Sequence, residues 1–165
     1  MLIHARNLPS VYYDNKIIGH SRNWPTEKWE ECISYFDNKY KGGYFGSIGT
    51  KNGARHIKGT TDFRDEPLDR VCTYMRGARV VVGESSGPLH LAMLCGTPVV
   101  VITHNRKEKS LDGRTNRWRY EKMMNPFNVK CTIFDRDNWR PKVNIVYYEI
   151  EKYLNNNYEK LGYKP

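Results

Sequence analysis

The sequence predicts a doubly wound α/β fold built on a single parallel sheet. Segments that favour strands alternate with segments that favour helices from residue 2 to about residue 155. Two runs, 79–83 and 98–102, are centred on consecutive β-branched residues, which is typical of strands that are buried on both faces. The segments around them have apolar residues at helical spacing, and this alternation places helices on both faces of one sheet.

The N-terminal part supplies a strand, a helix and a second strand. The apolar run 2–5 predicts the first strand, and a connection rich in Pro, Tyr and Asn follows it. A helix is expected from Pro25, because proline at the first position loses no hydrogen bond and Glu27 favours the positive end of the helix dipole. A glycine pair at 42–43 ends this helix, and the run 44–48 predicts the next strand. The apolar face of the helix comprises Trp29, Cys32, Ile33, Phe36 and Tyr40.

The C-terminal part continues the alternation. A predicted helix over 67–77 has apolar residues at positions i, i+3, i+4 and i+7 and stops at Gly77. The elements after it are the strand 79–83, a short helix 88–95, the strand 98–102, a basic loop 104–128, a strand 129–134 and a helix from about residue 141.

Length and composition indicate one globular domain. The chain has 165 residues, and a domain usually has about 100 to 200. We place the domain at 1–155 and expect a flexible tail at 156–165. No apolar run is long enough to span a membrane and no secretory signal is present, so we expect a soluble, cytoplasmic protein. The four cysteines and five histidines are scattered without ligand spacing, which predicts reduced thiols and no metal site.

The charge balance is strongly basic. Lys and Arg total 27 against 18 Asp and Glu, a net charge of +9. This balance favours an anionic partner, which could be nucleic acid, a phosphorylated metabolite or an acidic lipid surface. A basic surface can also serve solubility alone, and composition does not choose among these interpretations.

The turn between the strand 79–83 and the helix 88–95 has the residues of an anion site. A parallel strand delivers such a turn to the edge of the sheet where α/β proteins bind ligands. The turn offers backbone N–H groups, serine hydroxyls and a positive helix end to a phosphate or diphosphate, and Gly87 allows close approach. The alternative is that Ser-Gly-Pro only caps the helix. Its residues are Glu84, Ser85, Ser86, Gly87 and Pro88, followed by Leu89 and His90.

Two longer motifs resemble the heptosyltransferase-like glycosyltransferases of family 9, which have the GT-B fold. The first is Gly-x-Ser-Ser-Gly-Pro-x-His-Leu-Ala at 83–92, followed by Cys-Gly-Thr-Pro-Val-Val at 95–100. The second, at 22–29, is similar to the family's basic-x-Trp-Pro-x-x-x-Trp segment. The resemblance covers about residues 1–155. It implies a Rossmann-like domain equivalent to the C-terminal half of a GT-B enzyme, which binds a nucleotide-sugar as donor substrate without a metal or other cofactor.

The resemblance also implies roles for individual residues. Arg22 stands where the family has a lysine that approaches a phosphate, and a guanidinium binds phosphate in bidentate geometry. His90 matches a family histidine near a phosphate or sugar hydroxyl, although a histidine at this position can also cap the helix or pack in the core. The residues that match the diphosphate-binding turn are Ser85, Ser86, Gly87, Pro88 and Leu89.

This sequence departs from the family pattern at the start of the turn. The family has an acid where this chain has Ser85, and here the acid stands one place earlier, as Glu84. The strand 44–48 has no acid at its end, where family members often bind the ribose. Glu84 and Ser47 are therefore the candidates for contacts to the sugar or the ribose of the donor.

The basic stretch 104–122 has three interpretations. It could form a lid whose cations, among them Lys107, Lys109 and Arg114, close on the diphosphate. Its aromatic residues, Trp118 and Tyr120, could equally stack on the bases of a nucleic acid. The third interpretation is a solvated, charged loop.

Three functions follow from these observations. A GT-B enzyme has two α/β domains, and in this family the general base is an acid of the N-terminal domain, to which no part of this chain corresponds. We therefore expect a donor-binding domain or subunit that needs a second α/β domain, a second subunit or a homo-oligomer, and we assign no catalytic residue. The alternatives are a stand-alone nucleotide-binding protein without transferase activity and a small basic protein that binds or modifies nucleic acid.

Overall fold

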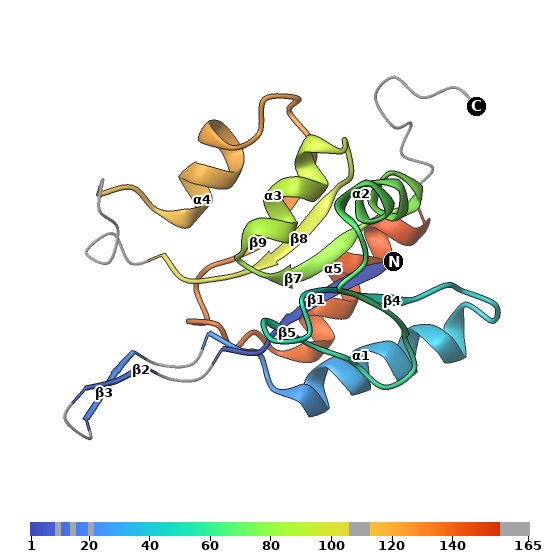
Figure 1. Ribbon diagram of the computed structural model, residues 1–165, viewed down its shortest axis with the longest axis horizontal. Coiled ribbons are helices and arrows are strands. Elements are labelled where there is room, and N and C mark those ends of the chain that lie inside the picture. The colour runs from blue at the N-terminus through green and yellow to red at the C-terminus, as the bar shows by residue number, and fades with distance from the viewer. Residues whose placement is uncertain (9–10, 14–15, 20–21, 106–112, 156–165) are drawn as a thin grey trace.

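The computed structural model describes residues 1–8, 11–13, 16–19, 22–105 and 113–155. A seven-stranded sheet forms its centre (Figure 1). The strands are β1 (Leu2–Arg6), β4 (Gly46–Gly49), β5 (Ala54–Arg55), β6 (Thr61–Arg64), β7 (Val81–Glu84), β8 (Val99–Ile102) and β9 (Cys131–Phe134).

The strand order confirms the predicted fold class. Six strands pair in parallel in the order β6-β4-β1-β7-β8-β9, and β5 pairs antiparallel with the end of β1. The chain builds one half of the sheet outward from β1, returns to the centre, and builds the other half outward from β7. This is the doubly wound arrangement, with the change of direction between β1 and β7.

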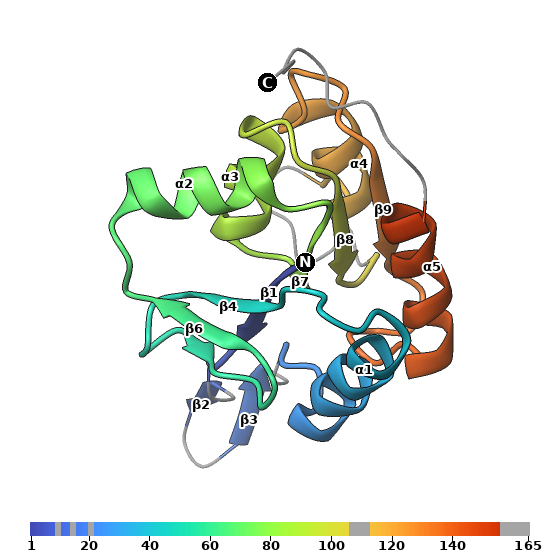
Figure 2. The same cartoon turned by 90° about the vertical axis from the view of Figure 1, so that its right-hand side faces the viewer.

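Helices cover both faces of the sheet (Figure 2). The long helices are α1 (Thr26–Lys39), α2 (Leu68–Gly77), α3 (Gly87–Leu94) and α5 (Val143–Asn155). Residues of α1 and α5 share one core cluster with Val82, whereas residues of α2 and α3 share the other with Val81. Successive residues of β7 therefore face different cores, which explains why the strand has no polar positions in its β-branched run.

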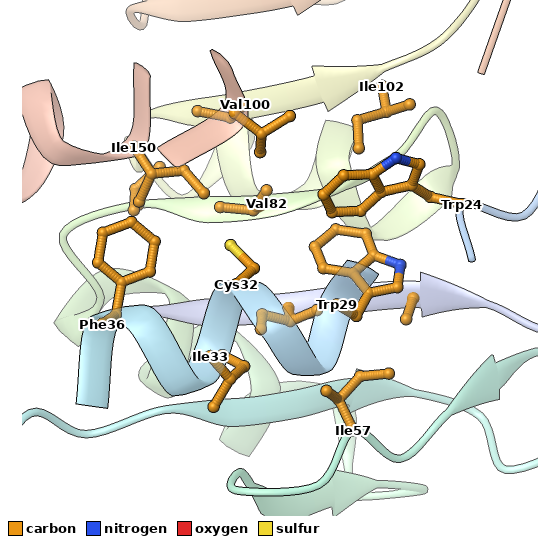
Figure 3. Close-up of a cluster of buried hydrophobic side chains, with 14 of the residues drawn as sticks. Trp24, Trp29, Cys32, Ile33, Phe36, Ile57, Val82, Val100, Ile102 and Ile150 are labelled. Atoms are coloured by element: carbon orange, nitrogen blue, oxygen red, sulfur yellow. The ribbon is translucent and has the colours of Figure 1, made fainter. Parts of the chain in front are cut away.

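The cluster beneath α1 anchors the start of that helix (Figure 3). Trp24 precedes the helix and packs edge-on against Trp29, with ring centroids 4.8 Å apart and planes at 89°. The indole N–H of Trp24 donates to the carbonyl oxygen of Pro141 at 3.1 Å. Both tryptophans of the Trp-Pro-x-x-x-Trp segment are thus core residues, and together they determine where the chain enters α1.

Several elements differ from the sequence prediction. The connection after β1 contains a small antiparallel hairpin, β2 (Val11–Tyr13) and β3 (Lys16–Gly19). The strand β6 also went unpredicted, because it is an edge strand whose side chains are largely exposed and no apolar run marks it. The first helix ends at Lys39, before the glycine pair.

The basic stretch after β8 is partly helical, whereas the sequence predicts a loop. It contains the short helix α4 (Asn116–Trp118) and a π-helical turn, η2 (Arg119–Met123). The predicted tail, 156–165, lies outside the described residues. None of the helices that the structure describes is long and apolar enough to cross a membrane.

The contact between β1 and β7 requires a glycine at position 83. A Cβ atom there would lie 2.5 Å from the carbonyl oxygen of His4 and 3.0 Å from Cδ2 of Leu89. We expect Gly83→Ala to lower the free energy of unfolding by about 1 to 3 kcal/mol, the usual effect of overpacking, as measured by urea denaturation. Gly87→Ala is the matched control, because a Cβ atom at Gly87 meets nothing within 4 Å. Equal stabilities of the two variants would contradict this account.

Candidate functional site

The carboxyl ends of β1 and β7 meet at the centre of the sheet. The two strands pair in parallel up to His4 and Gly83, and each ends shortly afterwards, at Arg6 and Glu84. From these ends the chain diverges toward α1 on one face and α3 on the other. Doubly wound proteins bind their ligands at such a divergence.

The buried carboxylate of Glu84 joins the segments that meet at this edge of the sheet. The residue is completely buried. Its Oε2 accepts the backbone N–H of Arg6 at 2.9 Å, and its Oε1 accepts the backbone N–H of Trp24 at 2.6 Å. Burial raises the pKa of Glu84, while the two amides and Arg55 oppose the rise. The sequence predicts a sugar or ribose contact for Glu84, whereas the structure uses both oxygens to join β1, β7 and the start of α1.

Arg55, at the end of β5, completes this internal arrangement. Its Nη2 lies 3.6 Å from Oε1 of Glu84 and donates to the carbonyl oxygen of Trp24 at 2.6 Å. Its Nε donates to the carbonyl oxygen of Arg6 at 2.8 Å, and its Nη1 bonds to Oγ1 of Thr26. The half-buried guanidinium thus partners the buried carboxylate and the same two backbone segments.

Two further guanidinium groups lie at this edge. Nη1 of Arg6 donates to the carbonyl oxygen of Ser85 at 3.0 Å, which places it against the turn before α3. Arg22 is exposed, and its guanidinium lies 5.7 Å from the ring centroid of Trp139. Burial, and then the positive charge of Arg22, lower the pKa of Arg6. The two cations therefore repel each other, and an anion placed between them would relieve the repulsion.

The two serines of the turn differ in their environment. Ser86 directs its Oγ inward, where it donates to the carbonyl oxygen of Glu84 at 2.7 Å and lies 2.9 Å from Nδ1 of His4. Ser85 is half-buried, and its Oγ accepts the hydroxyl of Tyr120 at 3.2 Å. Ser86 therefore maintains the shape of the turn, and Ser85 is the serine available to a ligand.

The first turn of α3 presents one open donor. Pro88 has no N–H, and Leu89 is completely buried with its N–H donated to the carbonyl oxygen of Ser86 at 3.1 Å. Gly87 is exposed, and its N–H has no partner among the described residues. An unpartnered N–H at the positive end of a helix is a donor for an anion.

His90 lies behind the turn and stacks on Tyr120. Their ring centroids are 4.4 Å apart and the planes differ by 21°. Burial, and then the charge of Arg119, lower the pKa of His90, so its ring is neutral at pH 7. Its Nδ1 is buried without a hydrogen-bond partner in the part of the chain that the structure describes. A buried polar atom of this kind is a candidate for a bond to a ligand.

The remaining candidates lie away from this turn or outside the described residues. Ser47 is completely buried, and its Oγ accepts the N–H of Ile57 at 3.1 Å, so it joins β4 to the segment after β5. The guanidinium of Arg114 lies 4.0 Å from the ring centroid of Trp118. The other two residues predicted for a lid, Lys107 and Lys109, lie outside the described residues.

No group of three or more His, Cys, Asp or Glu is placed to hold a metal ion within residues 1–8, 11–13, 16–19, 22–105 and 113–155.

Two residues of the site, Arg6 and His4, were not predicted from the sequence, and a third, Tyr120, was predicted only as a stacking residue for nucleic acid. Arg6 could have been found, because it ends the first strand of a parallel sheet and ligands bind at that end. His4 gives no such signal, since its position in an apolar run does not reveal its contact with Ser86. Tyr120 comes from a stretch predicted to be a loop, and it reaches Ser85 across 35 residues of sequence.

Solved structures of glycosyltransferases share this fold. E. coli heptosyltransferase WaaC with ADP matches 92% of this chain with a TM-score of 0.57 at 16% sequence identity. A family 9 glycosyl transferase from Veillonella parvula matches 98% of it with a TM-score of 0.52 at 15% identity. The match covers 43% and 41% of those two chains, so this chain spans less than half of either. No protein-family model and no curated protein matches the sequence. The heptosyltransferase-like fold that the motifs predict is thus confirmed.

The bonds of Glu84 predict a large effect of a small substitution. In Glu84→Gln an amide NH₂ replaces one carboxylate oxygen and faces a backbone N–H, which leaves two buried donors unpaired. We expect the free energy of unfolding to fall by about 2 to 4 kcal/mol in urea denaturation at pH 7. Glu30→Gln is the control, because Glu30 is exposed on α1. A Glu84→Gln protein as stable as this control would show that the buried carboxylate does not stabilise the contact between the end of β1 and the start of α1.

The buried imidazole of His4 predicts a pH dependence of stability. Burial, with a smaller contribution from Arg6, lowers the pKa of His4 from 6.5 to about 4. Between these values the unfolded chain binds a proton that the folded protein does not, so stability falls as the pH drops from 6.5 toward 4. We expect wild type to lose roughly 2 to 3 kcal/mol more than His4→Gln between pH 7 and pH 4.5, measured by urea denaturation. Parallel pH profiles of the two proteins would refute the assignment.

Proposed function

We propose that this chain is the donor-binding domain of a glycosyltransferase and that it binds the diphosphate of a nucleotide-sugar at the turn 85–88. The observation that supports this most directly is the convergence of Arg6, Arg22 and the open N–H of Gly87 at the junction of β1 and β7. Guanidinium groups and a helix N-terminus both favour phosphate oxygens.

The positions of the charged side chains support an anionic ligand. The acid of the turn, Glu84, is buried, and its oxygens accept from the backbone of Arg6 and Trp24. Its negative charge is partnered internally by Arg55. The charge of Glu84 also acts on Arg6, but Arg6 and Arg22 add two positive charges at this edge beyond that of Arg55. The site therefore attracts a group with more than one negative charge.

The fold is consistent with a nucleotide ligand. The heptosyltransferase structure with the same fold is described with ADP, a nucleoside diphosphate. Ligands of doubly wound sheets bind at the change of strand direction, and the turn 85–88 lies there. We infer that the diphosphate lies against this turn and that His90, whose Nδ1 is buried without a described partner, contacts a phosphate or a sugar hydroxyl.

The chemistry expected of these residues is stabilisation of the leaving group. In glycosyl transfer, the bond from the sugar C1 to the diphosphate oxygen breaks, and the acceptor oxygen bonds to C1 and gives its proton to a base. Arg6, Arg22 and the Gly87 N–H would stabilise the charge that develops on the departing diphosphate. Because guanidinium groups supply this positive charge, we propose that no metal is needed.

The acceptor site and the base are proposed to lie elsewhere. This chain spans 43% and 41% of the two solved chains that share its fold. We propose that a second α/β domain or subunit, or a second copy of the chain, supplies the acceptor site and the base. Co-purification with a second α/β chain would support a split transferase, whereas a free monomer that binds nucleotide-sugars would favour a stand-alone binding protein.

Binding of a nucleotide-sugar is expected to raise the melting temperature. At a ligand concentration about 100 times the Kd, binding adds about 2.7 kcal/mol to the stability of the folded state. We expect at least one of a set of UDP-, ADP- and GDP-sugars to give this rise in a thermal shift assay. Arg22→Ala should lose it because a phosphate partner is gone, and Gly87→Val should lose it because its side chain fills open space beside the turn.

Matched variants at the opposite end of the strands are the controls. Arg79 is an exposed arginine that precedes β7, and a Cβ atom at Gly77 meets nothing within 4 Å. Arg79→Ala and Gly77→Val should therefore keep the full thermal shift. If no nucleotide-sugar stabilises the wild-type protein, the proposed function is wrong. Loss of the shift in the controls as well would show that the substitutions act through stability and not through the turn.

A further inference from the structure

Tyr120 links the two serines of the turn through a directed chain of hydrogen bonds. The backbone N–H of Ser86 donates to the hydroxyl oxygen of Tyr120 at 3.3 Å. The hydroxyl of Tyr120 in turn donates to Oγ of Ser85 at 3.2 Å. A backbone N–H can only donate, so the tyrosine oxygen is the acceptor of the first bond and its proton is free for the second.

This chain of bonds determines what Ser85 can do. Because its Oγ accepts from Tyr120, the proton of its own hydroxyl is left for another acceptor, and none is present among the residues described. The backbone of Ser85 is held as well, since its carbonyl oxygen accepts from Nη1 of Arg6 at 3.0 Å. Ser85 therefore offers an O–H donor beside a guanidinium group, which is the pairing that a phosphoryl oxygen favours.

Tyr120 is rigidly placed. Its ring is buried in the core cluster beneath α3 and stacks on His90 at 4.4 Å. Burial raises the pKa of Tyr120 to about 12, so its hydroxyl stays protonated and able to donate at neutral pH. The residue lies in the π-helical turn η2, and such turns are frequent at functional sites.

We propose that Tyr120 is a positioning residue of the diphosphate site, which orients the hydroxyl of Ser85 so that it donates to a phosphoryl oxygen of the ligand. This inference rests on the proposed function. Each donor in the series from Ser86 to Tyr120 to Ser85 polarises the next, so the last hydroxyl is a stronger donor than an isolated serine. Tyr120 itself does not touch the ligand and acts only through Ser85.

A double-mutant cycle tests the proposal. The Kd values of ADP, UDP and GDP are measured by calorimetry for wild type, Tyr120→Phe, Ser85→Ala and the double variant. Each single variant should bind the best of these nucleotides about 5- to 20-fold more weakly, because a hydrogen bond to a charged group is lost or misdirected. The double variant should bind no more weakly than Ser85→Ala alone, since Tyr120 acts through that hydroxyl.

A second tyrosine provides the matched control. Tyr153 is also buried, and its hydroxyl lies 2.9 Å from Oγ1 of Thr132, in the other core cluster. Tyr153→Phe should leave the Kd unchanged even if it alters stability, and circular dichroism confirms that each variant is folded.

The outcomes separate the inference from the proposed function. A Tyr120→Phe protein that binds like wild type would overturn the positioning role, and so would an effect of Tyr120→Phe that persists undiminished in the Ser85→Ala background. Either result would leave the diphosphate site itself in place. If wild type binds none of the three nucleotides, the positioning role is overturned, and the thermal shift with nucleotide-sugars then decides whether the proposed function fails as well.

Discussion

Glu84 divides the two oxygens of one buried carboxylate between the end of β1 and the residue that leads into α1. A carboxylate without exposure to water destabilises a protein unless donors surround it, and here two backbone amides and Arg55 do so. Because removal of one partner leaves the others buried and unpaired, the strand ends, β5 and the start of α1 are held as one unit. Arg22 lies two residues before Trp24, so the position of this unit also determines where Arg22 lies.

The same arrangement determines the sign of the charge at this edge of the sheet. The sequence places Glu84 at the start of the turn and predicts a contact to the sugar or the ribose of the donor. In the structure its charge is directed inward and partnered by Arg55, while Arg6 reaches outward to the carbonyl oxygen of Ser85. The basic composition thus becomes a local site where Arg6 and Arg22 lie near each other, while the carboxylate of Glu84 is bonded to two backbone amides and paired with Arg55.

Much of the architecture could be predicted because the local patterns agree with the tertiary structure. The runs that became β7 and β8 are β-branched since both of their faces meet a core. Prediction was weaker where burial is partial or the chain folds back. The edge strand β6 has exposed side chains, and the π-helical turn η2 is formed in a stretch whose composition is that of a solvated loop.

The sequence by itself determined the alternation of strands and helices, the position of the turn 85–88 between β7 and α3 and the motifs of a heptosyltransferase-like fold. These features depend on residues that are neighbours in the chain. Only the tertiary structure decided that Glu84 accepts from the backbone of Arg6, that the side chain of Arg6 donates to the turn and that Tyr120 donates to Ser85. These contacts join residues that are between 35 and 79 positions apart. Their energies depend on burial and hydrogen-bond geometry, which exist only once the sheet has formed.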